Sequence, residues 1–280
     1  MIDFSQRERF FSLYSSGCLL DEEGWYSVTP EAIADQISER CRCDVILDAF
    51  CGVGGNAIAF AKTCERGACH RSIPHTAAHA LEHATNCHLP HPACCSAHSV
   101  IALDVSPVRL ALARHNAALY GVEDRIEFVL ADFFSFARTV KQRARRAIDV
   151  VFLSPPWGGP SYLSAKSASP SKSQLPTSAS SSALACNPHS AASEETHAEY
   201  SLEHIRPVHG AELFKIARGL TPNIAYFLPR NSSVDEISRL LADAPNERIE
   251  IEEEWMGTKL KALTCYFGGL VAGQEALFDS

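Results

Sequence analysis

Apolar runs with the length of buried strands alternate along this chain with segments of helical periodicity. The runs are VILDAF (45–50), SVIALDV (99–105), IEFVLADF (126–133), DVVFLSPPW (149–157), NIAYFLP (223–229), RIEIEEEW (248–255) and KLKALTCYFGG (259–269). Pro107 and Gly121 bracket one clearly helical segment, and a further helix is expected over 234–242. Apolar strands separated by helices predict a mostly parallel sheet covered on both faces, with binding residues just past the strand ends.

Two segments differ in composition from the rest of the chain, and we interpret both as insertions into one domain. The first, about 63–98, is rich in histidine and cysteine, and the second, about 164–197, is dominated by serine and alanine. The second composition buries too little apolar surface to offset the entropy lost on ordering, so we expect disorder there. The predicted organisation is an N-terminal helical cap (1–40), an α/β domain (41–273) that carries both insertions, and a tail (274–280).

Composition excludes several classes of protein. No apolar run reaches the roughly 18 to 20 residues that span a bilayer, and the N-terminus lacks the apolar stretch of a signal peptide. Eleven cysteines, an odd number without an export signal, favour reduced thiols over a disulfide framework. A net charge of −8 argues against a surface that grips long stretches of phosphate backbone. We therefore expect a soluble intracellular protein that would recognise RNA only through a short local feature.

A glycine-rich turn follows the first strand and marks a candidate nucleotide site. LDAFCGVGG places Asp48 at a strand end, with Gly52 and Gly54 before a helix, where a missing Cβ lets the backbone turn and approach a ligand. The next strand ends in Asp104, a candidate for the ribose hydroxyls of an adenosyl group. Asp48 and Asp104 lie 56 positions apart, and removing an insertion of about 35 restores the usual separation of about 20.

The third strand adds a further pair of candidates. Asp132 is expected to contact the adenine amine, and Phe133 its face. The glycine turn alone would also suit a nicotinamide fingerprint. Three strand ends in this order favour an adenosyl cofactor.

The motif SPPWGG (154–159) follows the fourth strand and is the most specific signal in the chain. An exocyclic base amine is a poor nucleophile because its lone pair is delocalised into the ring, so a catalyst must hold it with hydrogen-bond acceptors. Two successive prolines remove two N–H groups and stiffen the backbone, which leaves the Ser154 hydroxyl and the Pro155 carbonyl as the expected acceptors. Catalysis would then consist mostly of positioning the amine in line with a sulfonium methyl. Trp157 is expected to stack on the base, with a cation–π contribution of about 1 to 2 kcal/mol if the base carries a 7-methyl group.

These segments together resemble the trimethylguanosine synthases, the cap hypermethylases of small nuclear and related RNAs. The matching segments are EGWYSVTPE (23–31), LDAFCGVGGN (47–56), the run from IALD to ADF (101–133), DVVFLSPPWGGPSY (149–162) and IAYFLPRN (224–231). The resemblance implies an α/β class I, Rossmann-like methyltransferase with a seven-stranded sheet. Its activity would be transfer of methyl from S-adenosylmethionine to the 2-amino group of a 7-methylguanosine cap. The implied protein is a monomer without a catalytic metal, nuclear and also cytoplasmic.

The resemblance also implies roles for individual residues. The cofactor would be held by Ser27, Thr29, Asp48, Gly52, Gly54, Asn56, Asp104, Asp132 and Phe133. Trp157 would stack on 7-methylguanine, Ser154 would lie beside the reacting amine, Arg230 would lie near the cap phosphates, and Phe11 would line the pocket. A lysine that contacts phosphate in the family corresponds to Ile2 here, so that contact would be missing.

Several alternatives remain open at this stage. His75, His79 and His83 have a spacing that would align them on a helix and suit zinc, although a loosely packed insertion is the preferred interpretation. The basic run at 141–146 fits a nuclear import signal or an RNA contact, but a solvated face is preferred. The activity itself has two rivals, an amino-methyltransferase for a base inside RNA or DNA and a cap-binding module without catalysis.

Overall fold

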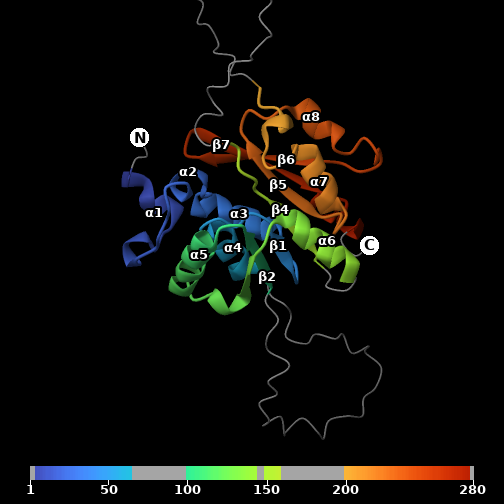
Figure 1. Ribbon diagram of the computed structural model, residues 1–280. Helices are drawn as coiled ribbons and strands as arrows, with labels where there is room; N and C mark the ends of the chain where they lie inside the picture. The colour runs from blue at the N-terminus through green and yellow to red at the C-terminus, as the bar shows by residue number, and fades with distance from the viewer. Residues whose placement is uncertain (1–3, 65–98, 144–147, 159–198, 278–280) are drawn as a thin grey trace, which may run out of the picture.

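A seven-stranded sheet with the order β3-β2-β1-β4-β5-β7-β6 organises the protein (Figure 1). The computed structural model describes residues 4–64, 99–143, 148–158 and 199–277. Its strands are β1 (Ile46–Asp48), β2 (Val100–Asp104), β3 (Ile126–Leu130), β4 (Val150–Leu153), β5 (Ile224–Pro229), β6 (Glu250–Met256) and β7 (Lys259–Phe267). Strands β1 to β5 run parallel, β7 is antiparallel to β5, and β6 is antiparallel to β7. The predicted mostly parallel, seven-stranded Rossmann-like architecture is confirmed.

Helices cover both faces of the sheet (Figure 1). The buried core on one face includes side chains of α3 (Glu31–Arg40), α4 (Gly55–Thr63) and α5 (Pro107–Leu119). The core on the other face includes side chains of α6 (Phe133–Arg143), α7 (Gly210–Arg218) and α8 (Val234–Arg239). Helix α5 begins as the sequence predicts, because Pro107 is its first residue and the Ser106 hydroxyl caps the amide of Arg109.

The N-terminal segment contains two short helices, α1 (Arg7–Phe10) and α2 (Gly24–Ser27), and is tied to the main layer by buried polar groups. The Asn116 side chain is fully buried in α5. It accepts a hydrogen bond from the amide of Leu19 at 2.8 Å and donates to the carbonyls of Leu19 and Val53. One amide side chain therefore fixes both the N-terminal segment and the glycine-rich turn against α5.

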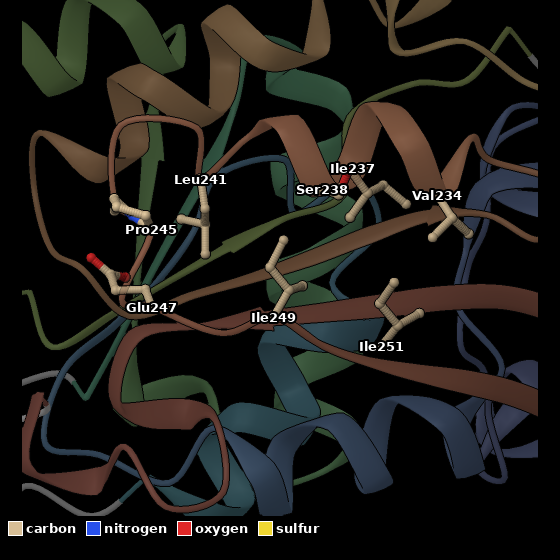
Figure 2. Close-up of a pocket in the computed structure, with 9 residues that line it drawn as sticks. Val234, Ile237, Ser238, Leu241, Pro245, Glu247, Ile249 and Ile251 are labelled. Atoms are coloured by element: carbon tan, nitrogen blue, oxygen red, sulfur yellow. The ribbon is translucent and has the colours of Figure 1, made fainter.

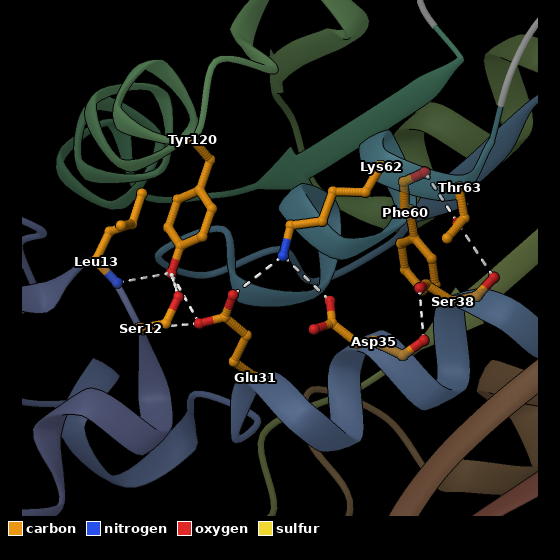
Figure 3. A network of polar contacts seen from close by, with 9 residues as sticks. All are labelled: Ser12, Leu13, Glu31, Asp35, Ser38, Phe60, Lys62, Thr63 and Tyr120. Carbon is orange, nitrogen blue, oxygen red and sulfur yellow. Dashed lines mark hydrogen bonds and ion pairs between the residues drawn. The ribbon is translucent and has the colours of Figure 1, made fainter.

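A second polar network joins the same segment to α3, α4 and α5 (Figure 3). The carboxylate of Glu31 accepts hydrogen bonds from the Ser12 amide at 2.5 Å and the Tyr120 hydroxyl at 2.8 Å. Lys62 lies 3.1 Å from the same carboxylate and 3.2 Å from that of Asp35. Burial would raise the pKa of Glu31, but the hydrogen bonds to its carboxylate outweigh this effect and lower the pKa. These contacts therefore keep Glu31 in its charged form.

The sheet order reverses between β1 and β4, which are parallel neighbours. From β1 the chain continues to β2 and β3 on one side, and then returns to β4 on the other. Ligands of open α/β sheets bind at the carboxyl ends of the strands at such a switch point. The topology therefore directs attention to the residues that follow Asp48 and Leu153. No helix among the described residues is both long and apolar enough to cross a membrane.

Candidate active site

The glycine-rich turn after β1 uses its glycines for two different reasons. Gly52 has φ +52° and Gly54 has φ +92°, a region that side chains other than glycine rarely adopt. A Cβ at Gly54 would lie 3.0 Å from the Cβ of Ala113, so this glycine permits close contact with α5 rather than with a ligand. A Cβ at Gly52 would meet no heavy atom within 4 Å, so the structure leaves space open beside it.

Asp48 is a buried carboxylate at the end of β1, with 0% of its surface exposed. Its Oδ1 accepts a long hydrogen bond of 3.4 Å from the Phe50 amide, while its Oδ2 has no hydrogen-bond partner among the described residues. Burial raises the pKa of Asp48 to about 7, and the charge of Asp104 adds to this effect. An acceptor without a partner at a switch point is suited to a ligand that carries N–H or O–H donors.

Asp104 ends β2 and is held in place by backbone amides. Its Oδ2 accepts from Gly52 at 3.0 Å, and its Oδ1 accepts from Ser106 at 2.8 Å. Its exposed fraction is 9%. The predicted pairing of the glycine turn with the second strand end is therefore a direct hydrogen bond, despite the intervening segment in the sequence.

Thr29 and Asn56 are also brought together. The Asn56 side chain donates from Nδ2 to the Thr29 hydroxyl at 3.0 Å, and its Oδ1 has no partner among the described residues. Ser27 differs, because it is exposed and its hydroxyl donates to the Glu23 carbonyl within its own turn. The N-terminal segment thus contributes Thr29 to the neighbourhood of the glycine turn, while Ser27 lies at the surface.

The third strand end separates the two residues that the sequence paired. Asp132 is exposed and accepts a hydrogen bond from the Ser135 amide at 2.9 Å, which caps α6 and lowers the pKa of its carboxyl. Phe133 is only 2% exposed and belongs to the core, with its ring centroid 6.1 Å from that of Phe50. The Phe133 ring is therefore covered by protein, and the expectation that it offers a surface to adenine does not match this placement.

The SPPW corner lies directly beside the glycine turn. The Ser154 hydroxyl donates to the Phe50 carbonyl at 3.4 Å, and the Ala49 amide donates to the Phe152 carbonyl at 3.1 Å. The residues that follow β1 and β4 are thus joined at the switch point. Because the Ser154 proton points to Phe50, the lone pairs on its Oγ remain to accept from another group.

Two residues that the sequence did not single out contact Trp157. Its ring centroid lies 5.2 Å from that of Phe227 in β5, at an interplanar angle of 33°. The Tyr200 hydroxyl donates to the Trp157 carbonyl at 3.4 Å. Burial raises the pKa of Tyr200 to about 12, which keeps this donor protonated at neutral pH. Tyr200 follows the serine-rich segment, so no local pattern could have indicated it.

Arg230 and Phe11 occupy different surroundings. Arg230 follows β5, is half-buried, and donates to the Leu260 carbonyl at 3.3 Å. Phe11 is 2% exposed, with its ring centroid 6.1 Å from that of Tyr120. Arg230 therefore lies at the same sheet edge as the SPPW corner, while Phe11 packs within the joint between the N-terminal segment and α5.

A separate surface cavity lies between α8 and β6 (Figure 2). It encloses about 410 Å³ and is lined mainly by apolar side chains. None of the residues predicted for the site lines it. His75, His79, His83 and, apart from Thr63 and Cys64, both insertions lie outside the described residues, as do residues 144–146 of the basic run at 141–146. Within the described residues, no group of three or more histidine, cysteine or acidic side chains is placed to hold a metal ion.

Comparison with known proteins identifies the chemistry of this site. A sequence model described as RNA cap guanine-N2 methyltransferase matches residues 94–184 and 172–270, which is more than half of the chain. The chain belongs to this family. The RNA cap guanine-N2 methyltransferases use S-adenosylmethionine as methyl donor, so the predicted family, enzyme class and cofactor are confirmed.

Two curated relatives of this cap methyltransferase share the name trimethylguanosine synthase. The protein from Schizosaccharomyces pombe is 29% identical over 269 residues, which cover 94% of this chain and 84% of the relative. The protein from Saccharomyces cerevisiae is 29% identical over 245 residues, or 84% of this chain. The matched region spans 56% of that second relative, so a large part of it has no counterpart here.

One solved structure has a similar fold. A chain described as a methyltransferase from Porphyromonas gingivalis W83 aligns with 94% of this cap methyltransferase and 47% of its own length, with a TM-score of 0.52. The sequence identity is 11%, so the likeness concerns the fold alone.

The residues present fit S-adenosylmethionine. Its ammonium and ribose hydroxyl groups are hydrogen-bond donors. The site offers as buried acceptors the Oδ2 of Asp48 and the Oδ1 of Asn56, neither of which has a partner among the described residues. The open space beside Gly52 admits a ligand to the turn. The donor and acceptor chemistry of the cofactor therefore matches what the chain leaves unsatisfied.

Proposed function

We propose that Ser154 and Pro155 hold the 2-amino group of a 7-methylguanosine cap while Trp157 stacks on its base. The observation that carries this proposal is the hydrogen bond from the Ser154 hydroxyl to the Phe50 carbonyl, 3.4 Å long. A hydroxyl that already donates its hydrogen to a carbonyl can only accept a hydrogen bond from the amine. A hydrogen bond accepted from the amine N–H increases the electron density on the amine nitrogen. S-Adenosylmethionine supplies an electrophilic methyl group on a sulfonium sulfur.

The stiff backbone of the corner supports a mechanism based on positioning. Pro155 is buried, and two consecutive prolines fix two φ angles and remove two amide donors that would compete for the amine. Ser154 and the Pro155 carbonyl can then accept from the two N–H groups of the amine and hold its nitrogen toward the donor. Holding the two reactants in a near-attack geometry lowers much of the activation free energy of methyl transfer without the need for a strong base.

The indole of Trp157 provides the stacking surface in this proposal. Phe227 supports the ring from β5, and Tyr200 fixes its backbone carbonyl. A 7-methylguanine base is cationic, and stacking it on an indole adds a cation–π attraction of about 1 to 2 kcal/mol when water is excluded. This attraction is the proposed basis for selecting a cap that already carries the 7-methyl group.

Asp48, Gly52, Asn56 and Asp104 are the proposed cofactor residues, joined by Thr29 through its hydrogen bond to Asn56. Asp132 remains a candidate for the adenine amine, since it is exposed at the end of the third strand. Ser27, Gly54 and Phe133 have local structural roles, and their predicted contacts with the cofactor are proposed only as indirect. Arg230 is proposed for the cap phosphates, and Phe11 supports the pocket from within the N-terminal joint.

The substrate is proposed to be the cap of small nuclear or related RNA, with di- and trimethylguanosine as products. Both curated relatives are named trimethylguanosine synthase, which supports trimethylguanosine as a product. A monomer, acting in the nucleus and also in the cytoplasm, is the proposed working form. The organisation into an N-terminal cap (1–40), a methyltransferase domain (41–273) and a tail (274–280) remains our proposal.

A labelling experiment tests this function. Protein is incubated with methyl-labelled S-adenosylmethionine and either GTP or 7-methyl-GTP, and the labelled position in the product is mapped. We expect label on the 2-amino nitrogen of 7-methyl-GTP and little on GTP. Equal labelling of both would favour an amino-methyltransferase for internal bases, and cap binding without labelling would favour a binding module.

A further inference from the structure

A cluster of four cations lies at the sheet edge where β4 and β5 end. Its members are Arg230 after β5, Lys259 and Lys261 of β7, and Arg9 of α1, whose charge acts on Lys261. We call these four residues the edge cluster. Because β5 and β7 are antiparallel and Pro229 pairs with Ala262, the next residues along, Arg230 and Lys261, lie opposite each other.

The pairing of β6 with β7 has an irregularity at Lys261. On β6, Glu254 pairs with Ala262 and the adjacent Trp255 pairs with Leu260, so Lys261 is an extra residue without a partner on β6. Such a bulge in an antiparallel pair bends the strand and changes the direction of a side chain, and bulges are frequent next to active sites. The bulge therefore belongs to the part of β7 that faces Arg230.

The edge cluster is not neutralised within the described protein. None of its four members forms an ion pair with a described residue, whereas Arg40, Lys62, Arg109 and Arg218 all do. Burial, followed by the charges of Lys259, Arg230 and Arg9, lowers the pKa of Lys261, so these three cations repel its ammonium group. A chain with a net charge of −8 retains here a group of like charges that a bound anion would stabilise.

The position of the cluster indicates which anion it suits. The proposed cap site at Ser154 and Trp157 follows β4, the neighbour of β5, and Arg230 follows β5. Lys261 and then Lys259 extend from Arg230 toward the end of the β6–β7 hairpin, which Figure 1 shows on the side of the N-terminal helices. A phosphate chain that leaves the cap at Arg230 would meet these lysines next.

From this geometry we infer that Lys259 and Lys261, with Arg9, bind the phosphodiesters of the RNA that follow the cap. This inference rests on the proposed function of the site. Arg230 holds the triphosphate bridge, and the lysines extend the contact by a short distance into the transcript. The cluster thereby supplies phosphate contacts beyond the cap itself.

The salt dependence of binding tests the inference. Affinities of the protein for 7-methyl-GTP and for a short capped oligoribonucleotide are measured over a range of salt concentrations. Each phosphate contact on a single strand contributes about 0.7 to the slope of log affinity against log salt. The Lys259→Gln/Lys261→Gln double variant should therefore lower the slope for capped RNA by about 1.4, or roughly sevenfold in affinity ratio across a fourfold change in salt.

The decrease should be clearly smaller for 7-methyl-GTP, which has no phosphodiester. Lys215→Gln is the matched control. Lys215 is an exposed lysine near the end of α7, the helix that precedes the amino end of β5, whereas the edge cluster lies beyond the carboxyl end of that strand. The control substitution should leave both slopes unchanged. The exposed Lys259→Gln alone should lower the slope by about 0.7, and it serves if the double variant does not fold.

An unchanged slope for capped RNA in both variants overturns the inference, and so does an equal decrease for both ligands, which would place the lysines at the bridge. The labelling of 7-methyl-GTP by the unmodified protein is measured separately. Failure of that labelling counts against the proposed function, whereas failure of the salt test alone counts only against the role of the edge cluster.

Discussion

Replacing the buried carboxylate of Asp48 by an amide should stabilise the protein and impair its cofactor binding. Burial raises the pKa of Asp48 from its ordinary value of 3.8 to about 7. Between about pH 4 and pH 7 the unfolded chain has released this proton while the folded protein keeps it, so stability falls as pH rises. Above pH 7 the full cost is present, and 3 pKa units correspond to about 4 kcal/mol. Asp48→Asn removes the titration but retains an oxygen for the Phe50 amide.

Glu254 provides a matched comparison. It is also 0% exposed, and burial raises its pKa from 4.5 to about 7, but it lies on β6 at the far edge of the sheet. Glu254→Gln should give a similar pH-dependent gain of about 3 kcal/mol between pH 4 and pH 8. Only Asp48→Asn should weaken S-adenosylmethionine binding, by at least about tenfold, since it places an amide N–H where the cofactor needs an acceptor.

Urea denaturation at several pH values and calorimetric titration with the cofactor measure the two effects. The informative quantity is how the difference in unfolding free energy between a variant and the unmodified protein changes with pH. A difference that is the same at every pH reports only a change in local packing. A stability difference between Asp48→Asn and the unmodified protein that stays constant from pH 4 to pH 8 would refute the reasoning. Equal losses of cofactor affinity in both variants would show that Asp48 acts only through the fold.

Three further substitutions test other parts of the structure. Asn116→Ala leaves buried backbone groups of the N-terminal segment without partners. We expect the free energy of unfolding, measured by urea denaturation, to fall by about 3 kcal/mol, and proteolysis before residue 30 to become faster. Unchanged proteolysis would contradict the anchoring role. Trp157→Ala should abolish turnover on 7-methyl-GTP while the Kd for S-adenosylmethionine, measured by calorimetry, stays within about twofold; a large loss of cofactor affinity would mean that the indole is structural. Tyr200→Phe removes the hydrogen bond to the Trp157 carbonyl and should raise the KM for 7-methyl-GTP about two- to tenfold with little change in cofactor affinity; an unchanged KM would refute its positioning role.

The sequence predicted the sheet well because its signals are local. Each apolar run corresponds to an observed strand, and Pro107 marks the start of α5. Helix α8 ends at Arg239 rather than at 242, because the amides of Leu240 and Leu241 bond to carbonyls three residues back and tighten the last turn. Helices α6 and α7 were not predicted. Asp132, which caps α6, and the apolar residues on the buried face of α7 are recognisable in the sequence only once the helix positions are known.

The placement of the candidate residues at strand ends was predictable, whereas the surroundings of their side chains were less so. Asp104 and Ser154 both bond to the turn that follows Asp48, because carboxyl ends of parallel strands share one edge. Phe133 and Phe134 are adjacent, and sequence alone does not tell which ring faces the core. Tyr200 reaches Trp157 from a segment distant in sequence, a contact that depends on the tertiary fold.

The requirement for the guanine amine can be measured directly with 7-methyl-inosine triphosphate, which has the same charge and methyl group as 7-methyl-GTP but lacks the 2-amino group. We predict that this analogue competes with 7-methyl-GTP for the protein and accepts no label from S-adenosylmethionine. Transfer of label to the inosine analogue at a rate similar to that of 7-methyl-GTP would contradict the assignment of the Ser154 corner to that amine.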